Sequence, residues 1–132
     1  RPLLSTAPPT MWRAAMAEAR TLDPLDAELR AFEQEVRFTI GVREGVSILL
    51  TRQGADSGRE ALPSLLDAAE VRPQRADVHA WVAVALDRAG SRAADAAFAK
   101  ALQLCPGLAR TRTGERLRQA QPSARLLRLL EP

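Results

Sequence analysis

The feature that most constrains this chain is a set of residues that recurs three times at identical spacing and ends each time in proline. The recurring sets are Trp12, Met16, Ala19 and Pro24; Ala61, Leu65, Ala68 and Pro73; and Ala94, Phe98, Ala101 and Pro106. Offsets of four and then three residues place the first three members of each set on one face of a helix. Proline five residues later cannot continue that helix. The sequence therefore predicts an internal repeat of helices that pack through small side chains.

A partner helix is clearest before the third set. Val78, Trp81, Val82 and Ala85 follow the i, i+3, i+4, i+7 pattern of an amphipathic helix, and Gly90 supplies a turn after it. Together with the third set they form a predicted helix–turn–helix unit of about 33 residues, from Pro73 to Pro106.

This unit resembles the tetratricopeptide repeat (TPR) family, and the resemblance extends from Thr10 to about Ala120. Trp12 departs from the small residue that the family usually has at that position. The residues that carry the resemblance are Ala94, Phe98, Ala101 and Pro106, with Trp81 and Ala85 on the first helix. The resemblance implies an all-α fold, a short α-solenoid of antiparallel helix pairs with a C-terminal capping helix. It also implies a groove between successive first helices that accepts a peptide or helix.

The middle unit carries an insertion of about 16 residues, at about positions 37–53. Leu29, Phe32, Val36 and Ile40 form a helical stripe, which begins after Asp26 as a helix N-cap.

The alternation within residues 38–50 would also fit two short strands around 43–45, but two strands alone are marginal in water. We therefore favour one long helix, or two helices broken near Gly41 to Gly45. Gly54 to Gly58 is expected to be the following loop, with Ser57 and Glu60 as a capping box.

The chain is expected to have three parts, of which the last carries the basic charge. Residues 1–10 are expected to be an extended segment, 11–106 the repeat array and 107–132 a basic capping helix and tail. The tail carries six arginines and two glutamates, so its net charge of +4 accounts for the +3 of the whole chain. Ser123 is expected to cap a short leucine-rich run that docks on the last repeat. The alternative for this run is a basic amphipathic contact with a membrane surface or an acidic partner.

Residue types suited to catalysis are sparse. A catalytic triad or a histidine metal site would need His79, the single histidine, and only Asp77 and Asp87 lie near it in the sequence. Cys105 is the single cysteine and lies at a helix C-terminus, which disfavours a thiolate. The segment 41–45 lacks the lysine of a phosphate-binding loop. We expect no catalytic residue, no metal and no cofactor.

These observations predict a non-enzymatic protein–protein interaction module or scaffold subunit. The strong preference for arginine over lysine and the abundance of alanine indicate a GC-rich, bacterial coding sequence, so the module would serve a larger bacterial assembly. The expected partner-binding residues are Arg30, Gln34, Arg37, His79, Ala83 and Asp87. A second apolar contact is expected at Phe38, Ile40, Val46 and Ile48 on the insertion.

The alternative hypothesis is an accessory subunit of a membrane-anchored envelope complex, of the polysaccharide or secretion machinery. No apolar run is long enough to cross a bilayer, so this hypothesis requires an anchor outside the chain, which begins at Arg1 without methionine. We expect the chain to be part of a larger protein or assembly. The compartment stays open between the cytoplasm and the periplasmic face of a membrane. Nucleic acid is not an expected partner, because neither lysines nor aromatic residues accompany the tail arginines.

Overall fold

A computed structural model describes residues 26–131. The chain divides into two compact units, Arg1–Arg37 and Phe38–Pro132, and of the first only 26–37 are described. The described elements are α3 (Asp26–Thr51), α4 (Ala55–Val71), α5 (Ala76–Arg88), α6 (Ala93–Leu104), the 3-10 turn η1 (Leu108–Arg110), α7 (Arg112–Gln119) and α8 (Ala124–Leu129).

The described residues form helices and no β-strand, which confirms the all-α prediction. The N-terminal segment 1–10 and the first repeat set, from Trp12 to Pro24, lie outside the described residues. None of the helices between residues 26 and 131 is both long and apolar enough to span a membrane.

The insertion is part of one continuous helix rather than a strand pair or a broken helix. Gly41 and Gly45 lie four residues apart in α3, on the face that meets α4. A Cβ atom at Gly41 would lie 2.6 Å from the carbonyl oxygen of Ser64, and one at Gly45 would lie 2.4 Å from Cγ of Leu65. The two glycines therefore allow close helix packing. This contact offsets the roughly 1 kcal/mol that each glycine costs inside a helix.

The start of α4 differs from the prediction. Residues 54–58 are not a loop, because α4 begins at Ala55 after Gly54, which has a φ of 93°. Ser57 is buried in the first turn, where its hydroxyl donates a hydrogen bond to the carbonyl of Gly54 at 2.6 Å. Glu60 forms an ion pair with Arg52. The predicted capping box is therefore wrong, because the left-handed Gly54 allows the helix to start three residues earlier.

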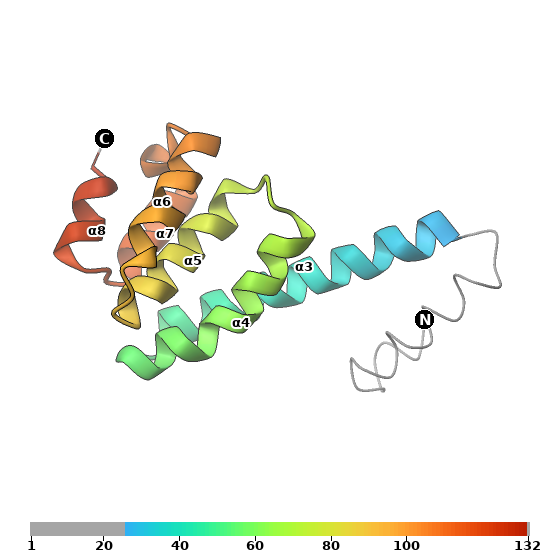
Figure 1. Cartoon of the computed structure of the whole chain (residues 1–132), viewed down its shortest axis with the longest axis horizontal. Helices are drawn as coiled ribbons and strands as arrows, with labels where there is room; N and C mark the ends of the chain where they lie inside the picture. Colours follow the sequence, from blue (N-terminus) through green and yellow to red (C-terminus); the bar gives the residue numbers. More distant parts are fainter. Residues whose placement is uncertain (1–25, 132) are drawn as a thin grey trace. The chain divides into compact units, whose positions relative to one another are not determined.

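The recurring sets mark the buried faces of the second helices. Ala61, Leu65 and Ala68 on α4 have no exposed surface, and the equivalent positions Ala94, Phe98 and Ala101 on α6 are at most 1% exposed. Between these two helices lies α5, which packs against both (Figure 1). Gly90, with a φ of 81°, makes the predicted turn between α5 and α6.

The C-terminal region covers the end of the helix pairs. The predicted capping helix within residues 107–132 is α7, and the 3-10 turn η1 precedes it, because the Thr111 side chain caps α7 by accepting a hydrogen bond from the backbone N–H of Gly114 at 3.2 Å. Ser123 caps α8, as predicted. Leu117, Leu126 and Leu130 are at most 1% exposed and belong to the core. The tail is therefore docked.

Candidate functional site

A groove of about 590 Å³ runs along the second unit and is lined by α3, α5 and α7. In Figure 1 the second helices α4 and α6 lie nearer to the reader than α7 and the C-terminal part of α3. Neither α4 nor α6 contributes a residue to the lining of the groove. Its lining residues are Phe38, Thr39, Val42, Arg43, Val46, Ser47, Leu50 and Thr51 of α3, Asp77 and Trp81 of α5, and Thr113 and Arg116 of α7.

The floor of the groove is apolar. Phe38, Val42, Val46 and Leu50 recur at intervals of four residues, so α3 presents one continuous apolar stripe. Trp81 of α5 adds an indole ring and is 3% exposed. These side chains leave a hollow that apolar groups of another molecule could fill without moving the backbone.

Cationic groups cluster at the Phe38 end of the stripe. The guanidinium carbons of Arg72 and Arg75 lie 4.8 and 5.0 Å from the centre of the Phe38 ring, within the range of cation–π attraction. Arg75 also forms an ion pair with Asp77 at 2.8 Å. The charge of the only acidic residue that lines the groove is therefore already offset by its neighbour.

Two further arginines give the groove a positive potential. Arg43 projects from α3 and Arg116 from α7, so the cations come from different helices around the floor. Both are exposed, and neither forms an ion pair with a carboxylate of the described residues. An anionic group entering the groove would meet them without displacing an internal partner.

Hydrogen bonds to backbone carbonyls hold α7 in place. Arg118 donates to the carbonyls of Ala109 at 2.8 Å and of Leu130 at 3.0 Å, which ties α7 to the turns on either side. Arg88 of α5 donates to the carbonyl of Ala120 at the end of α7. These bonds fix the helix that contributes Thr113 and Arg116 to the groove.

The Arg88 side chain also joins the ends of α3 and α4. It donates to the carbonyl of Arg52 at 2.9 Å and to the hydroxyl of Ser57 at 3.2 Å. Burial lowers the pKa of Arg88 by desolvating its charge, while the neighbouring Asp87 acts in the opposite direction. Arg88 thus connects the end of α3, the start of α4 and the end of α7 to the C-terminal end of α5.

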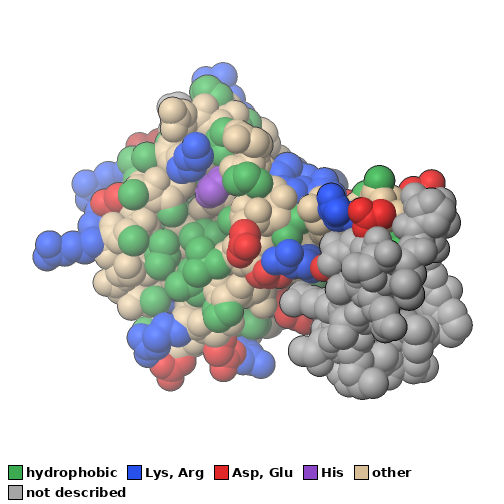
Figure 2. All heavy atoms as spheres, turned by 45° about the vertical axis from the view of Figure 1, so that its right-hand side comes forward, with side chains coloured by type: hydrophobic (Ala, Val, Ile, Leu, Met, Phe, Trp, Pro, Cys, Tyr) green, Lys and Arg blue, Asp and Glu red, His purple; other side chains and the backbone are tan. Residues whose placement is uncertain are grey.

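The structure places the predicted binding residues of α5 away from the groove. Ala83 has no exposed surface. Nε2 of His79 lies 2.7 Å from the carbonyl oxygen of Pro73, and its imidazole is visible at the surface beside a group of hydrophobic side chains (Figure 2). Asp87 binds Ser123 in the tail. On α5 the groove is lined instead by Asp77 and Trp81, since these face α3 and α7.

The predicted partner-binding residues of α3 do not line the groove either. Arg30, Gln34 and Arg37 lie on the part of α3 in the first unit, whereas the groove begins at Phe38.

The predicted second apolar contact is not one exposed surface. Phe38 and Val46 are buried in the groove floor, Ile48 is partly buried against the core, and Ile40 is 41% exposed. The helical period of α3 divides these side chains between two faces, because positions 38 and 46 are eight residues apart, as are positions 40 and 48, while the two pairs are offset by two residues.

Within residues 26–131 there is no group of three or more histidine, cysteine, aspartate or glutamate side chains placed to hold a metal ion.

No family model, no curated protein and no solved structure matches the chain.

Proposed function

We propose that this chain is a non-enzymatic protein-interaction module that binds a segment of a partner protein in the groove between α3, α5 and α7. The observation that carries the proposal is the combination of an apolar floor with two arginines, Arg43 and Arg116, that have no carboxylate partner among the described residues. The resemblance to TPR proteins supports the same use of the surface formed by first helices.

The chemistry of the groove defines the partner segment. Apolar side chains would fill the hollow over Val42, Val46 and Trp81, and aspartate or glutamate side chains on the same segment would pair with Arg43 and Arg116. Arginine suits this role because its planar group binds a carboxylate through two parallel hydrogen bonds. The partner is therefore a protein with an apolar segment flanked by acidic residues.

Photo-crosslinking in the native cell tests this proposal. A photoreactive amino acid at Ser47, which is exposed in the groove, is compared with one at the exposed Arg59 of α4, which does not line the groove. We expect a discrete adduct from position 47 that position 59 does not give, identified by mass spectrometry. Equal crosslinking from both positions, or none from position 47, would contradict the groove as a binding site.

Charge reversal then tests, with the purified partner, whether Arg43 and Arg116 bind acidic side chains of that partner. The variant Arg43→Glu/Arg116→Glu is expected to bind at least about tenfold more weakly, a change of about 1.4 kcal/mol. Arg59→Glu serves as the matched control, and reversal of the partner's acidic residues to arginine should restore binding to the double variant. The alternative prediction is an accessory role in a membrane-anchored complex. It would be supported if the partner identified by crosslinking has a membrane-spanning segment.

A further inference from the structure

A second surface lies between α6 and α8. Two hollows of about 470 and 380 Å³ share Leu102 of α6 and Leu129 of α8 as lining residues. Leu129 is 40% exposed and Leu127, also on α8, is 38% exposed. We refer to Leu102, Leu127 and Leu129, with the arginines described next, as the α6–α8 surface.

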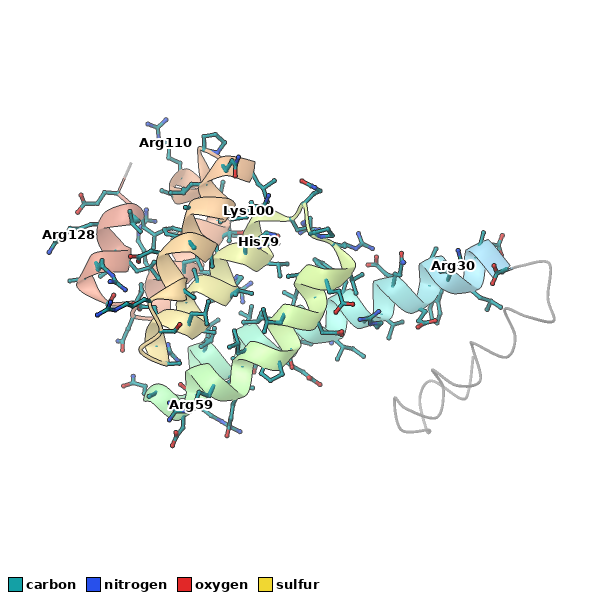
Figure 3. The ribbon with its side chains drawn as sticks, viewed as in Figure 1. Arg30, Arg59, His79, Lys100, Arg110 and Arg128 are labelled. Atoms are coloured by element: carbon teal, nitrogen blue, oxygen red, sulfur yellow. The ribbon has the colours of Figure 1, made fainter. Side chains whose placement is uncertain are left out.

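The buried side of α8 determines where its other side chains lie. Leu126 and Leu130 are four residues apart and both 1% exposed, so they face the core. At about 100° per residue, Leu127 and Leu129 lie on the two flanks of the helix and Arg128 lies between them on the outer side. Figure 3 shows the Arg128 side chain extending away from the ribbon. The helix thus presents an arginine between two half-exposed leucines.

Three arginines and two acidic residues line the two hollows, so their charged side chains sum to +1. Arg110 lines one hollow and Arg128 the other, and neither is paired with a carboxylate among residues 26–131. Arg125 is bound to Asp95 at 3.3 Å, and Glu131 is the other acid nearby. Figure 3 shows Arg110 also extending away from the ribbon. Residues 107–132 carry a net charge of +4.

We propose that the α6–α8 surface binds an anionic lipid bilayer. Leu127 and Leu129 would enter the interface between headgroups and acyl chains, while Arg110 and Arg128 would bind lipid phosphates. Each further basic residue near the membrane surface adds to the electrostatic attraction. The other arginines of residues 107–132 would therefore also strengthen binding.

The size of the surface favours a bilayer over a protein partner. Stable protein complexes bury about 800 Å² on each partner around a packed apolar centre. Two half-exposed leucines on a six-residue helix offer much less apolar area than that. A bilayer requires no fixed complementary shape, so a small apolar contact combined with several arginines is sufficient for reversible binding.

Co-sedimentation of the purified chain with vesicles tests this inference, which does not depend on the groove. We expect binding to vesicles of phosphatidylcholine with phosphatidylglycerol and none to vesicles of phosphatidylcholine alone. Arg110→Gln and Arg128→Gln should each weaken binding about fivefold. The double variant Leu127→Ser/Leu129→Ser should weaken vesicle binding more than either arginine variant does, and its helicity by circular dichroism should be unchanged.

The matched control is Arg59→Gln/Leu66→Ser on α4, where Leu66 is 50% exposed. This control removes one cation and one exposed leucine outside the α6–α8 surface. Its binding to the anionic vesicles should therefore weaken by no more than the loss of one charge explains, about fivefold at most. Failure to bind the anionic vesicles would overturn the proposal, as would an equal loss in the control. Loss of binding to a protein partner in the leucine variant, without any vesicle binding, would instead assign the surface to protein contact.

Discussion

The carboxylate of Asp87 on α5 accepts two hydrogen bonds from Ser123, one from its backbone N–H at 2.9 Å and one from its hydroxyl at 2.6 Å. The same hydroxyl oxygen accepts a bond from the backbone N–H of Leu126. Asp87 therefore fixes the residue that caps α8. Because α8 carries Leu126 and Leu130 into the core, this contact joins the docking of the tail to the central helix.

Removal of either partner should loosen the tail. Asp87→Ala and Ser123→Ala should each lower the free energy of unfolding by about 1–2 kcal/mol, since Asp87→Ala removes two charge-assisted hydrogen bonds and Ser123→Ala removes one of them together with a helix cap. Chemical denaturation measures the change. The double variant should lose less than the sum of the two single losses, whereas strict additivity would show that the pair does not interact. Asp56→Ala, at a side chain that is 93% exposed, is the control.

Arg88 should be among the least replaceable polar residues. Arg88→Met leaves the carbonyls of Arg52 and Ala120 without their donor, and we expect a loss of about 2–3 kcal/mol in the free energy of unfolding. Arg92→Met, at an exposed arginine just before α6, should change it by no more than about 0.5 kcal/mol. Similar effects of the two substitutions would show that the bonds of Arg88 contribute little.

Gly58 is required by packing. A Cβ atom there would lie 2.5 Å from the carbonyl oxygen of Ala85 and 2.9 Å from the backbone nitrogen of Ala89. Gly58→Ala should therefore force α4 away from α5 and cost about 1–3 kcal/mol. Gly107→Ala is the matched control, because nothing lies within 4 Å of its Cβ position and its φ is −90°. A melting temperature that is equal in both variants would refute this packing.

The small residue of the repeat can be tested in the same way. Ala101 has no exposed surface, so Ala101→Leu should overpack the contact of α6 with its neighbours and cost about 1–3 kcal/mol. Ala96 lies on the exposed side of the same helix, where leucine should be tolerated. Thermal unfolding of the two variants measures the difference, and a stable Ala101→Leu variant would contradict the assigned buried face.

Local patterns were sufficient to predict the faces that α4 and α6 bury. The spacing of Ala94, Phe98 and Ala101 before Pro106 is a property of a few consecutive turns, so it appears directly in the sequence. The start of α4 was harder to predict, because both Gly54 and Ser57 are common at helix N-termini and only the φ of 93° at Gly54 distinguishes them.

The groove could be predicted only in part. The stripe of Phe38, Val42, Val46 and Leu50 is visible in the sequence as a helical period. The contribution of Arg116 is not, because it depends on how α7 returns past α5. His79, Ala83 and Asp87 were expected in the groove from the resemblance to TPR proteins. Because α5 has apolar residues on nearly every side, its periodicity could not show which face lines the groove.

The sequence alone determined the all-α class, the faces that α4 and α6 bury through the repeated sets, and where the basic charge is concentrated. Each of these properties depends on residues that are close together in the chain. Only the tertiary structure decided that Gly41 and Gly45 permit close packing, that Asp87 binds Ser123 and that Arg43 and Arg116 border one groove. These relationships join residues 20 to more than 70 positions apart, and their geometry follows from how the helices pack.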